Sequence, residues 1–416
     1  MQILKYLTMC MITLLVFIGI VTADSEDFNT MRKMALEPYS EYHLYRGDLH
    51  VHTNYSADAD SRQEINSVIQ SAKGRLDFIA ITDHDEHKED VLTKDEWQQI
   101  VAVCQKQNCD GEFVVIPGYE WTSPDQHFKP GSKDYEHKIL YFTNPPDDIF
   151  RFSNFPTPEI LANAVSGAGG IGHTPHPRSF TVMDLKDQQI IVKHYERDYW
   201  DYGHAFSSTF SNAEVYPNGP LYQYDFDKVE SDDIKEESVQ ISWEFEIQKA
   251  LSMGYKLGFV ATSDTHWPTI IPGQERCSVV FAKELTRKSI LDALKVRRNY
   301  AEICPENIDV FFSISGHIVG DEFETTRNPC LILNIQSERE IHEVYIYKNN
   351  NKWITINKGD LSPFSSDFKE VSFTVEDNNF LSNSFYFVKI RLKGNNEYGT
   401  PFTVFTSPVW VNKRIE

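Results

Sequence analysis

The chain has 416 residues, a length that exceeds one small domain and suits a barrel followed by a second module. Its composition is that of an ordinary globular protein, but its formal net charge of −21 argues against nucleic-acid polymers as non-specific partners. No two cysteines have the C-x-x-C spacing, so zinc bound by thiolates is not indicated.

The first segment, residues 1–23, has the pattern of a secretory signal peptide. Lys5 precedes an apolar run at 9–20, and small residues follow it at 21–23. The run is short for a membrane span, and a retained membrane anchor is the alternative interpretation. We therefore expect a secreted or periplasmic protein with no membrane span after signal cleavage. Residues 24–44 would then form a polar lead-in.

Residues 45–304 alternate between apolar strands and amphipathic helices. Helical spacing of apolar residues covers 61–73 and 286–298. A capping box at 93–96 begins another helix, and Pro158 takes the first position of a fourth. Alternation of this kind predicts a parallel sheet or barrel.

From residue 305 to residue 416 the pattern changes to short β-rich segments separated by turn residues. This pattern predicts a small antiparallel β-sandwich as an accessory domain. His317 and His342 are isolated there and are interpreted as structural or surface residues. The acidic stretch at 222–237 is expected to be a long loop or lid. The predicted strands are Val310–Ile314, Leu331–Ile335, Val344–Tyr347, Val371–Val375, Phe385–Leu392 and Phe402–Val411.

A pair of histidines, His50 and His52, lies near the end of the first apolar run. Successive side chains alternate across a strand, so both imidazoles point to the same face. Apolar runs that end in His, Asp or Glu recur along the chain. Buried strands that open onto such residues are typical of an enzyme site at the C-terminal rim of a parallel barrel. The further runs are Ile79–Asp85, Val114–Glu120, Gly169–His176 and Gly258–His266.

Each fragment has a structural alternative when it is taken alone. The pair His50 and His52 could be surface residues of a strand, and His137 could cover apolar surface. Together these alternatives fail, because several polar groups at consecutive strand ends would be costly to bury without partners. Neutral imidazoles and carboxylates are also the ligands that zinc, manganese and iron favour, so the pattern predicts a metal site.

The order HxH, TDH, PGxE, H, HP and DxH resembles the PHP family, the polymerase-and-histidinol-phosphatase superfamily of metal-dependent phosphoesterases. The resemblance covers about residues 45–300. Within that family the chain is most similar to extracytoplasmic metallohydrolases of the carbaryl-hydrolase type, which share the Gly-Asp-Leu-His start at Gly47 and the Gly-Tyr-Glu-Trp motif at Gly118. The resemblance implies a distorted (β/α)7 barrel with two or three divalent metal ions (Zn, Mn or Fe) at the strand ends.

The resemblance also implies the metal ligands. His50, His52, Glu120 and Asp264 match those of a first metal, and Glu120 is able to bridge to a second. His137 and His176 match ligands of the second metal, and the remaining positions match Asp58, His84 and His266. Two features depart from the family pattern. Asp58 lies one residue late, with Asp60 as a rival, and an additional histidine, His173, precedes the His-Pro turn.

The function that we expect is a secreted, multinuclear metal-dependent hydrolase, foremost a phosphoesterase that uses a hydroxide bridging the metals. His173 or Arg178 would donate a proton to the leaving group or hold an anionic oxygen, and Arg276 is a second candidate for an anion contact. Asp83 and Asp85 would orient imidazoles. The substrate would be a small-molecule or oligosaccharide anion.

Two other classes of function remain open. The first is a metal-dependent lyase or dehydratase on oligosaccharides that contain uronic acids, because metals that hold a carboxylate acidify the neighbouring C–H. The second is a binding module without catalysis. Aromatic residues that would suit stacking on a sugar, with core packing as their alternative role, are Trp121, Tyr202, Tyr216 and Trp267.

Overall fold

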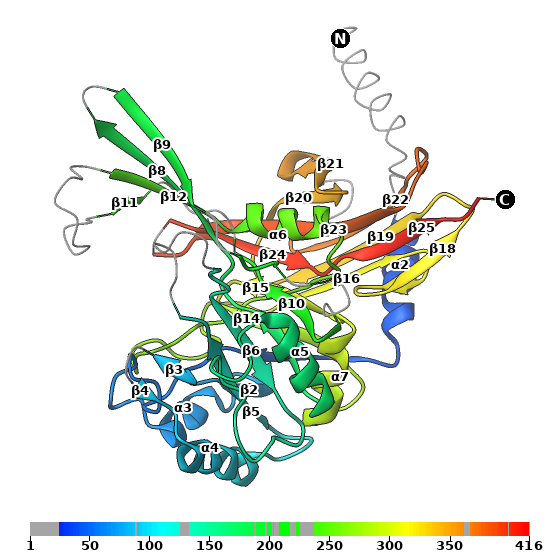
Figure 1. Cartoon of the computed structure of the whole chain (residues 1–416). Helices are drawn as coiled ribbons and strands as arrows, with labels where there is room; N and C mark the ends of the chain where they lie inside the picture. The colour runs from blue at the N-terminus through cyan, green and yellow to red at the C-terminus, as the bar shows by residue number, and fades with distance from the viewer. Residues whose placement is uncertain are drawn as a thin grey trace, which may run out of the picture.

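The computed structural model describes residues 25–87, 90–124, 133–186, 189–195, 198–201, 203, 208–216, 222–224, 237–361, 367–397 and 399–415. The predicted signal peptide lies outside these residues, and so does most of the predicted acidic loop. The chain has an α/β fold with a mixed sheet and few helices (Figure 1). Among the described residues, no helix has the length and apolar character that crossing a membrane requires.

The strands that carry the predicted site lie next to one another in one sheet, in the order β1, β2, β5, β6, β7, β10 and β13. Neighbouring strands are parallel except at β6, which is antiparallel to both β5 and β7. The expected parallel arrangement is therefore wrong at this strand. The bounds are β1 His43–Asp48, β2 Phe78–Ile81, β5 Val114–Thr122, β6 His137–Tyr141, β7 Ile171–Thr174, β10 Phe210–Glu214 and β13 Gly258–Val260.

The two ends of this row of strands meet. Val51, which follows β1, forms a parallel bridge with Thr265, which follows β13. The His52 amide donates to the Thr265 carbonyl over 3.1 Å, and the Asp264 amide donates to the His50 carbonyl over 3.0 Å. Contact between the first and last strands is what a closed barrel requires. The (β/α)7 count itself stays a prediction.

Four of the helices, α3, α4, α5 and α7, lie where the sequence predicts them, and α6 is not predicted. In α3 the buried residues are Ile65, Val68, Ile69 and Ala72, which is the spacing of one helical face. The predicted capping box begins α4, where Thr93 and Glu96 each accept a hydrogen bond from the other's amide. The helices are α3 Ile65–Ala72, α4 Lys94–Gln107, α5 Pro158–Gly167, α6 Trp243–Ser252 and α7 Arg287–Lys295.

The C-terminal strands continue the same sheet. β14 pairs with β1, β15 pairs with β14, and β24 pairs with β15, so hydrogen bonding runs without a break into the last third of the chain. A second sheet of β17, β16, β19 and β22 shares a hydrophobic core with it. The predicted sandwich and its boundary at residue 305 stay predictions. The bounds are β14 Cys277–Ala282, β15 Asn299–Ile303, β16 Ile308–Ile314, β17 His317–Ile318, β18 Glu322–Thr325, β19 Cys330–Ser337, β20 Ile341–Lys348, β21 Asn351–Asn357, β22 Glu370–Glu376, β23 Ser384–Asn395, β24 Pro401–Thr406 and β25 Val409–Lys413.

The expected polar lead-in contains a helix that packs on the C-terminal sheet. α2 Ser25–Leu36 lies against β19 and β22 at the side of the molecule opposite to α4 (Figure 1). Met31 and Ala35 are buried there, and so is Tyr39 in the following 3₁₀ turn, Glu37–Tyr39. The turn holds its place because the Tyr39 hydroxyl donates to the Phe312 carbonyl.

A small antiparallel sheet projects from the body of the molecule at the upper left of Figure 1. It consists of β8 Ser179–Lys186, β9 Gln189–Tyr195, β11 Tyr222–Tyr224 and β12 Glu237–Ser242. The ends of the expected acidic loop therefore lie in strands, and its middle lies outside the described residues. A short hairpin of β3 Glu86–His87 and β4 Asp90–Val91 lies near α3 and α4.

Candidate metal centre

Residues at the ends of neighbouring strands meet at one rim of the sheet. β5 carries Glu120 near its C-terminal end, and His176 and Asp264 follow β7 and β13. His137 begins its strand instead of ending it. It reaches the same rim because β6 is antiparallel, which pairs His137 with Thr122 at the end of β5.

A first set of ligand-type atoms lies deepest. The Nε2 atoms of His50 and His52 are 2.9 Å apart. Glu120 Oε2 lies 3.0 Å from the first and 3.1 Å from the second. Asp264 Oδ1 lies 3.2 Å and 3.3 Å from the same two nitrogens. Both imidazoles and the Glu120 side chain are almost completely buried, whereas the Asp264 side chain is 35% exposed.

The surrounding hydrogen bonds fix the tautomers of these two imidazoles. His50 Nδ1 lies 2.9 Å from the Glu214 carboxylate, and His52 Nδ1 lies 2.8 Å from Ser56 Oγ, whose proton goes to Asp83. With the proton on each Nδ1, both Nε2 atoms are free to offer a lone pair to the same point between them. Two such nitrogens beside two carboxylate oxygens form a donor set that fits a divalent metal.

A second set uses the other oxygen of the same glutamate. Glu120 Oε1 lies 2.7 Å from His137 Nδ1 and 3.3 Å from His176 Nε2. His137 Nδ1 is buried against this carboxylate oxygen. A buried imidazole nitrogen beside a carboxylate oxygen is a pair of donor atoms that fits a cation. Glu120 thus presents one oxygen to each set, as a bridging carboxylate does.

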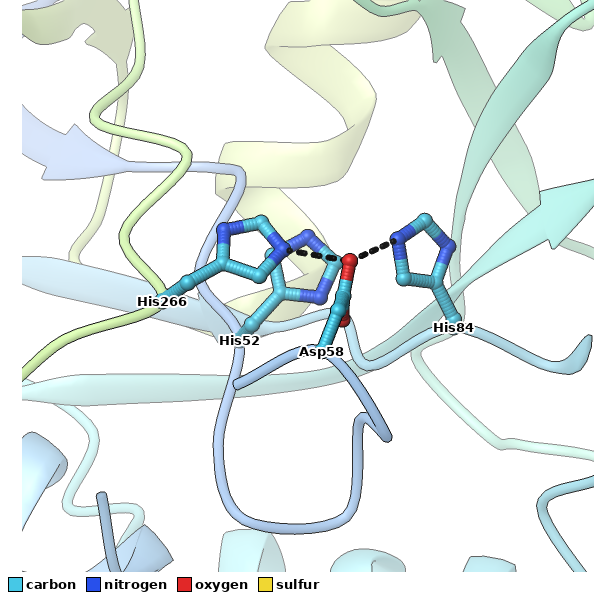
Figure 2. Close-up of side chains that lie close together, drawn as sticks. All are labelled: His52, Asp58, His84 and His266. Carbon is cyan, nitrogen blue, oxygen red and sulfur yellow. Dashed lines mark ion pairs between the residues drawn. The ribbon is translucent and has the colours of Figure 1, made fainter. Parts of the chain in front are cut away.

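A third set surrounds Asp58 at the more open side of the rim. Figure 2 shows the Asp58 carboxylate between the rings of His84 and His266, with His52 beside them. Asp58 Oδ2 lies 3.5 Å from His84 Nε2 and 3.3 Å from His266 Nε2. The rival, Asp60, pairs with Arg62 through contacts of 2.6 and 2.9 Å and so turns away from the cluster.

Charge within the cluster shifts its pKa values strongly. Burial alone would raise the pKa of Glu120, but the imidazoles of His50, His137 and His84 lower it well below its usual range. Burial opposes protonation of His50, but the nearby carboxylates, Asp264 first, raise its pKa well above the usual value. Without a cation the cluster therefore holds protons between carboxylates and imidazoles, and bound divalent ions would take their place.

The backbone is left-handed at two of these residues. His176 has φ 30° and Asp264 has φ 51°, although neither residue is glycine. Such conformations cost about 1–3 kcal/mol each and persist only where neighbouring contacts hold them. Backbone strain of this kind is common at functional sites. The two strained residues, Asp264 and His176, both place their side chains in the cluster.

The two expected proton donors lie differently from the ligand-type residues. His173 is 1% exposed, with Nδ1 2.8 Å from the Tyr141 hydroxyl and Nε2 3.1 Å from Glu214. Both of its ring nitrogens are engaged within the core, and its role as an acid for a leaving group stays a prediction. Arg178 is half-buried, and its carbonyl accepts from Tyr199 over 3.4 Å. Its role as an anion contact stays a prediction.

Only one of the two aspartates expected to orient imidazoles does so. Asp83 accepts from the Thr53 amide over 2.6 Å and from Ser56 Oγ over 2.9 Å, and it thereby fixes the hydroxyl that faces His52. Asp85 instead accepts from the Thr122 amide over 2.8 Å. Asp85 therefore holds the end of β5 and not an imidazole.

Glu214 is a buried neighbour of the cluster that the sequence pattern does not single out. It is completely buried at the end of β10 and contacts both His50 and His173. The pattern that could have identified it is an acidic residue at the end of a strand, as at Glu120. Ser211 and Asn212 interrupt the apolar run before Glu214, so this pattern is not evident in the sequence.

The rim also offers space and one exposed aromatic side chain. Trp121 and Tyr216 are buried and Tyr202 lies outside the described residues, but Trp267 is 51% exposed. Its ring centroid lies 5.6 Å from that of His266. A cavity of about 190 Å³ lies beside His84 of the third set. It is lined by Asn54, Tyr55, Ala57, His84, Asp90, Val91, Leu92 and Glu96.

Comparisons with known proteins found similarity to solved structures alone. No family model matches the sequence, and no curated protein matches it. One similar structure is a two-domain protein from Bacteroides vulgatus ATCC 8482, described as containing a "predicted PHP-like metal-dependent phosphoesterase". It is 16% identical with a TM-score of 0.40, and the match covers 88% of this chain and 96% of that one.

Two further similar structures are of endonuclease Q. One is the lesion-specific endonuclease from Pyrococcus furiosus, and the other is a complex of endonuclease Q with a 27-mer duplex substrate that has an abasic lesion at the active site. They are 14% and 13% identical with TM-scores of 0.34, and this chain spans 56% and 57% of their length. The descriptions of these neighbours thus name a predicted PHP-like metal-dependent phosphoesterase and an endonuclease, and this chain has groups of His, Asp and Glu that could hold metal ions. TM-scores this low establish no function, which depends on the side-chain geometry.

Proposed function

We propose that this chain is a multinuclear metal-dependent hydrolase that acts foremost as a phosphoesterase on small anionic substrates. The observation that carries the proposal is the placement of Glu120, whose two carboxylate oxygens face two adjacent sets of imidazole nitrogens. A carboxylate shared in this way holds two cations close together, and that arrangement suits the transfer of a phosphoryl group.

The proposed ligands divide into the three sets described above. His50, His52, Glu120 and Asp264 would hold the first ion, Glu120 with His137 and His176 the second, and Asp58 with His84 and His266 the third. When bound, such ions lower the pKa of water and stabilise negative charge on phosphoryl oxygens. A donor set that consists of nitrogen and oxygen atoms suits zinc, manganese or iron.

The protein's own residues would exclude water from one side and admit substrate from the other. His50 and His52 close the inner side, because both are completely buried. The Asp58 and Asp264 side chains are 30% and 35% exposed, so the substrate would approach past them. Arg178 and Arg276 are our candidates for contacts with anionic substrate oxygens. The Arg276 guanidinium lies 4.8 Å from the centroid of the Tyr216 ring.

The location of the protein and its closer kinship, as we propose them, rest on its sequence. We propose a secreted or periplasmic location from the signal-peptide pattern, and a kinship with the carbaryl-hydrolase type from the motifs at Gly47 and Gly118. The lyase alternative and the role as a binding module have no observation of their own in the described residues, so both enter as outcomes of the test, the binding module as metallated protein that converts no substrate of the panel.

The test is to load the purified protein with manganese, zinc or iron and to assay a small substrate panel. The panel holds phosphate monoesters and diesters, carboxylic esters, uronic oligosaccharides and duplex DNA. We expect release of phosphate from monoesters, and loss of this activity in His50→Ala. A metallated protein that leaves every phosphate ester untouched would contradict the phosphoesterase proposal, and an ultraviolet-absorbing product from uronic oligosaccharides would favour the lyase. Cleavage of duplex DNA would overturn the expected exclusion of nucleic acid.

A further inference from the structure

We infer that Glu214 is a positioning residue that fixes ligands of the first and second metal sets at the same time. It does so through the side chain of His50 and through the backbone of His176. This inference rests on the proposed function, since it concerns the ligands of the proposed metals. Glu214 itself would bind no metal.

The two contacts of Glu214 come from different oxygens. Oε1 lies 2.9 Å from His50 Nδ1, whose other nitrogen faces the first set. Oε2 accepts from the backbone amide of His176 over 2.8 Å, and the ring of His176 faces the second set. One rigid carboxylate therefore sets the spacing between a ligand of each set. A carboxylate that holds the outer nitrogen of a ligating histidine fixes its tautomer and ring orientation.

The remaining hydrogen-bond capacity of Glu214 is filled by other donors. Thr262 Oγ1 donates to Oε1 over 2.7 Å, and the Tyr216 hydroxyl donates to Oε2 over 3.2 Å. An ionised carboxylate offers about four lone-pair sites, and five groups face its two oxygens: Thr262, Tyr216, His50, the His176 amide and His173. A carboxylate engaged by this many protein groups is suited to orient ligands, so we assign Glu214 to positioning, although its oxygens and the nitrogens of His50 and His173 lie close enough together to hold an ion.

The hydrogen bond to the His176 amide is important because two features make the backbone conformation of His176 unfavourable. His176 has φ 30°, in the left-handed region, and it also precedes Pro177. A residue before proline is pushed toward extended conformations, so the observed one needs an external hold. The charge-assisted bond from the His176 amide to Glu214 supplies that hold.

A second chain of hydrogen bonds supports Glu214 from behind. His173 Nε2 lies 3.1 Å from Glu214 Oε1, and His173 Nδ1 lies 2.8 Å from the Tyr141 hydroxyl. That hydroxyl donates to the carbonyl of Leu49 over 2.6 Å, one residue before His50. The additional histidine of this sequence therefore ties Glu214 to the strand that carries the first ligands.

The experiment measures divalent-ion binding by the full chain, wild type against Glu214→Gln, with zinc as the probe. Glutamine keeps one acceptor oxygen but turns an NH₂ toward a donor, so it must release His50 or His176. We expect the zinc Kd of the first two sets to rise about 10- to 100-fold, as is typical when such an outer partner is lost. The third set should keep its ion, because Glu214 contacts none of its residues in the described structure.

Two further variants separate positioning from a general loss of stability. Glu302→Gln is the matched control, because Glu302 is 1% exposed in the same sheet and bonds to Arg46 and Cys277 instead of the cluster. It should keep wild-type zinc content. Glu214→Asp keeps the buried charge but is too short to reach both partners. It should lose zinc affinity even if Glu214→Gln does not fold.

The readouts are zinc stoichiometry by mass spectrometry and the visible spectrum after cobalt substitution, which reports ligand geometry and not folding. Wild-type zinc affinity and cobalt spectra in Glu214→Gln or Glu214→Asp would overturn the inference. A wild-type protein that binds no divalent ion would instead contradict the proposed function.

Discussion

Polar side chains are placed differently at the strand ends that carry the metal-type cluster and in the sheets of residues 305–416. At the strand ends, His50, His52 and Glu120 are almost completely buried, with the Nε2 atoms of the two imidazoles 2.9 Å apart. In the C-terminal sheets, pairs such as Arg391 and Glu343 lie at the surface, and the buried Asp377 is paired with Lys348.

The proposed function lies with the first region. Burial of many ionisable side chains costs several kcal/mol unless each is fully satisfied, so we expect such a cluster where its chemistry is needed. The C-terminal sheets satisfy their buried charge and so have the character of ordinary structural β-sheet. The predictions below test this contrast.

The largest effect is expected from Glu120→Ala, because this change removes a ligand from two sets at once. We expect phosphoesterase activity to fall by about a thousandfold or more, which corresponds to about 4 kcal/mol of transition-state stabilisation. Metal content should fall with it. The matched control is His342→Ala, a half-buried histidine of the C-terminal sheet. An equal loss of activity in the control would remove the contrast between the regions.

An intermediate effect, on stability alone, is expected from Ile335→Ala in β19. Ile335 is completely buried in the core that the two C-terminal sheets share. Its truncation should lower the free energy of unfolding by about 2–5 kcal/mol, measured by urea titration. The activity and metal content of the folded fraction should stay at wild-type levels. Loss of metal in this variant would show that the C-terminal core also shapes the site.

The smallest effect is expected from Trp267→Ala at the open side of the rim. An exposed ring beside His266, held by a turn from the Ile270 amide to the Trp267 carbonyl, is suited to stacking on a substrate ring. Loss of about 0.5–1.5 kcal/mol should raise KM about two- to tenfold for phosphate esters of sugars. The KM for glycerol phosphate should not change. Leu381→Ala, which removes an exposed side chain from the C-terminal region, is the control. An equal rise of KM for both esters would contradict stacking.

Much of the site follows from the sequence because strand ends gather at one rim. Alternation along a predicted strand identifies His50 and His52 as candidate ligands. Glu120 and Asp264 are identified by their positions after apolar runs. These rules depend on local periodicity alone. The grouping of these residues in space required only that neighbouring strands share an edge.

Other parts could not be predicted because they depend on contacts distant in the chain. The direction of β6, which brings His137 to the rim, is set by pairing with β5 and β7. The choice of Asp58 over Asp60 depends on Arg62, which occupies Asp60. Glu214 follows a strand with few apolar residues, so its burial becomes evident only with its partners.

The unbroken hydrogen bonding from β15 to β24 has a consequence for dissection of the chain. The register pairs Tyr300 with Thr406 and Ile303 with Thr403, so residues close to the C-terminus complete the edge of β15. A fragment that ends at residue 305 would leave that edge open as a template for pairing with other chains. Such a fragment should self-associate, whatever its metal content. The last strands thus protect the half of the chain that carries the metal-type cluster against aggregation.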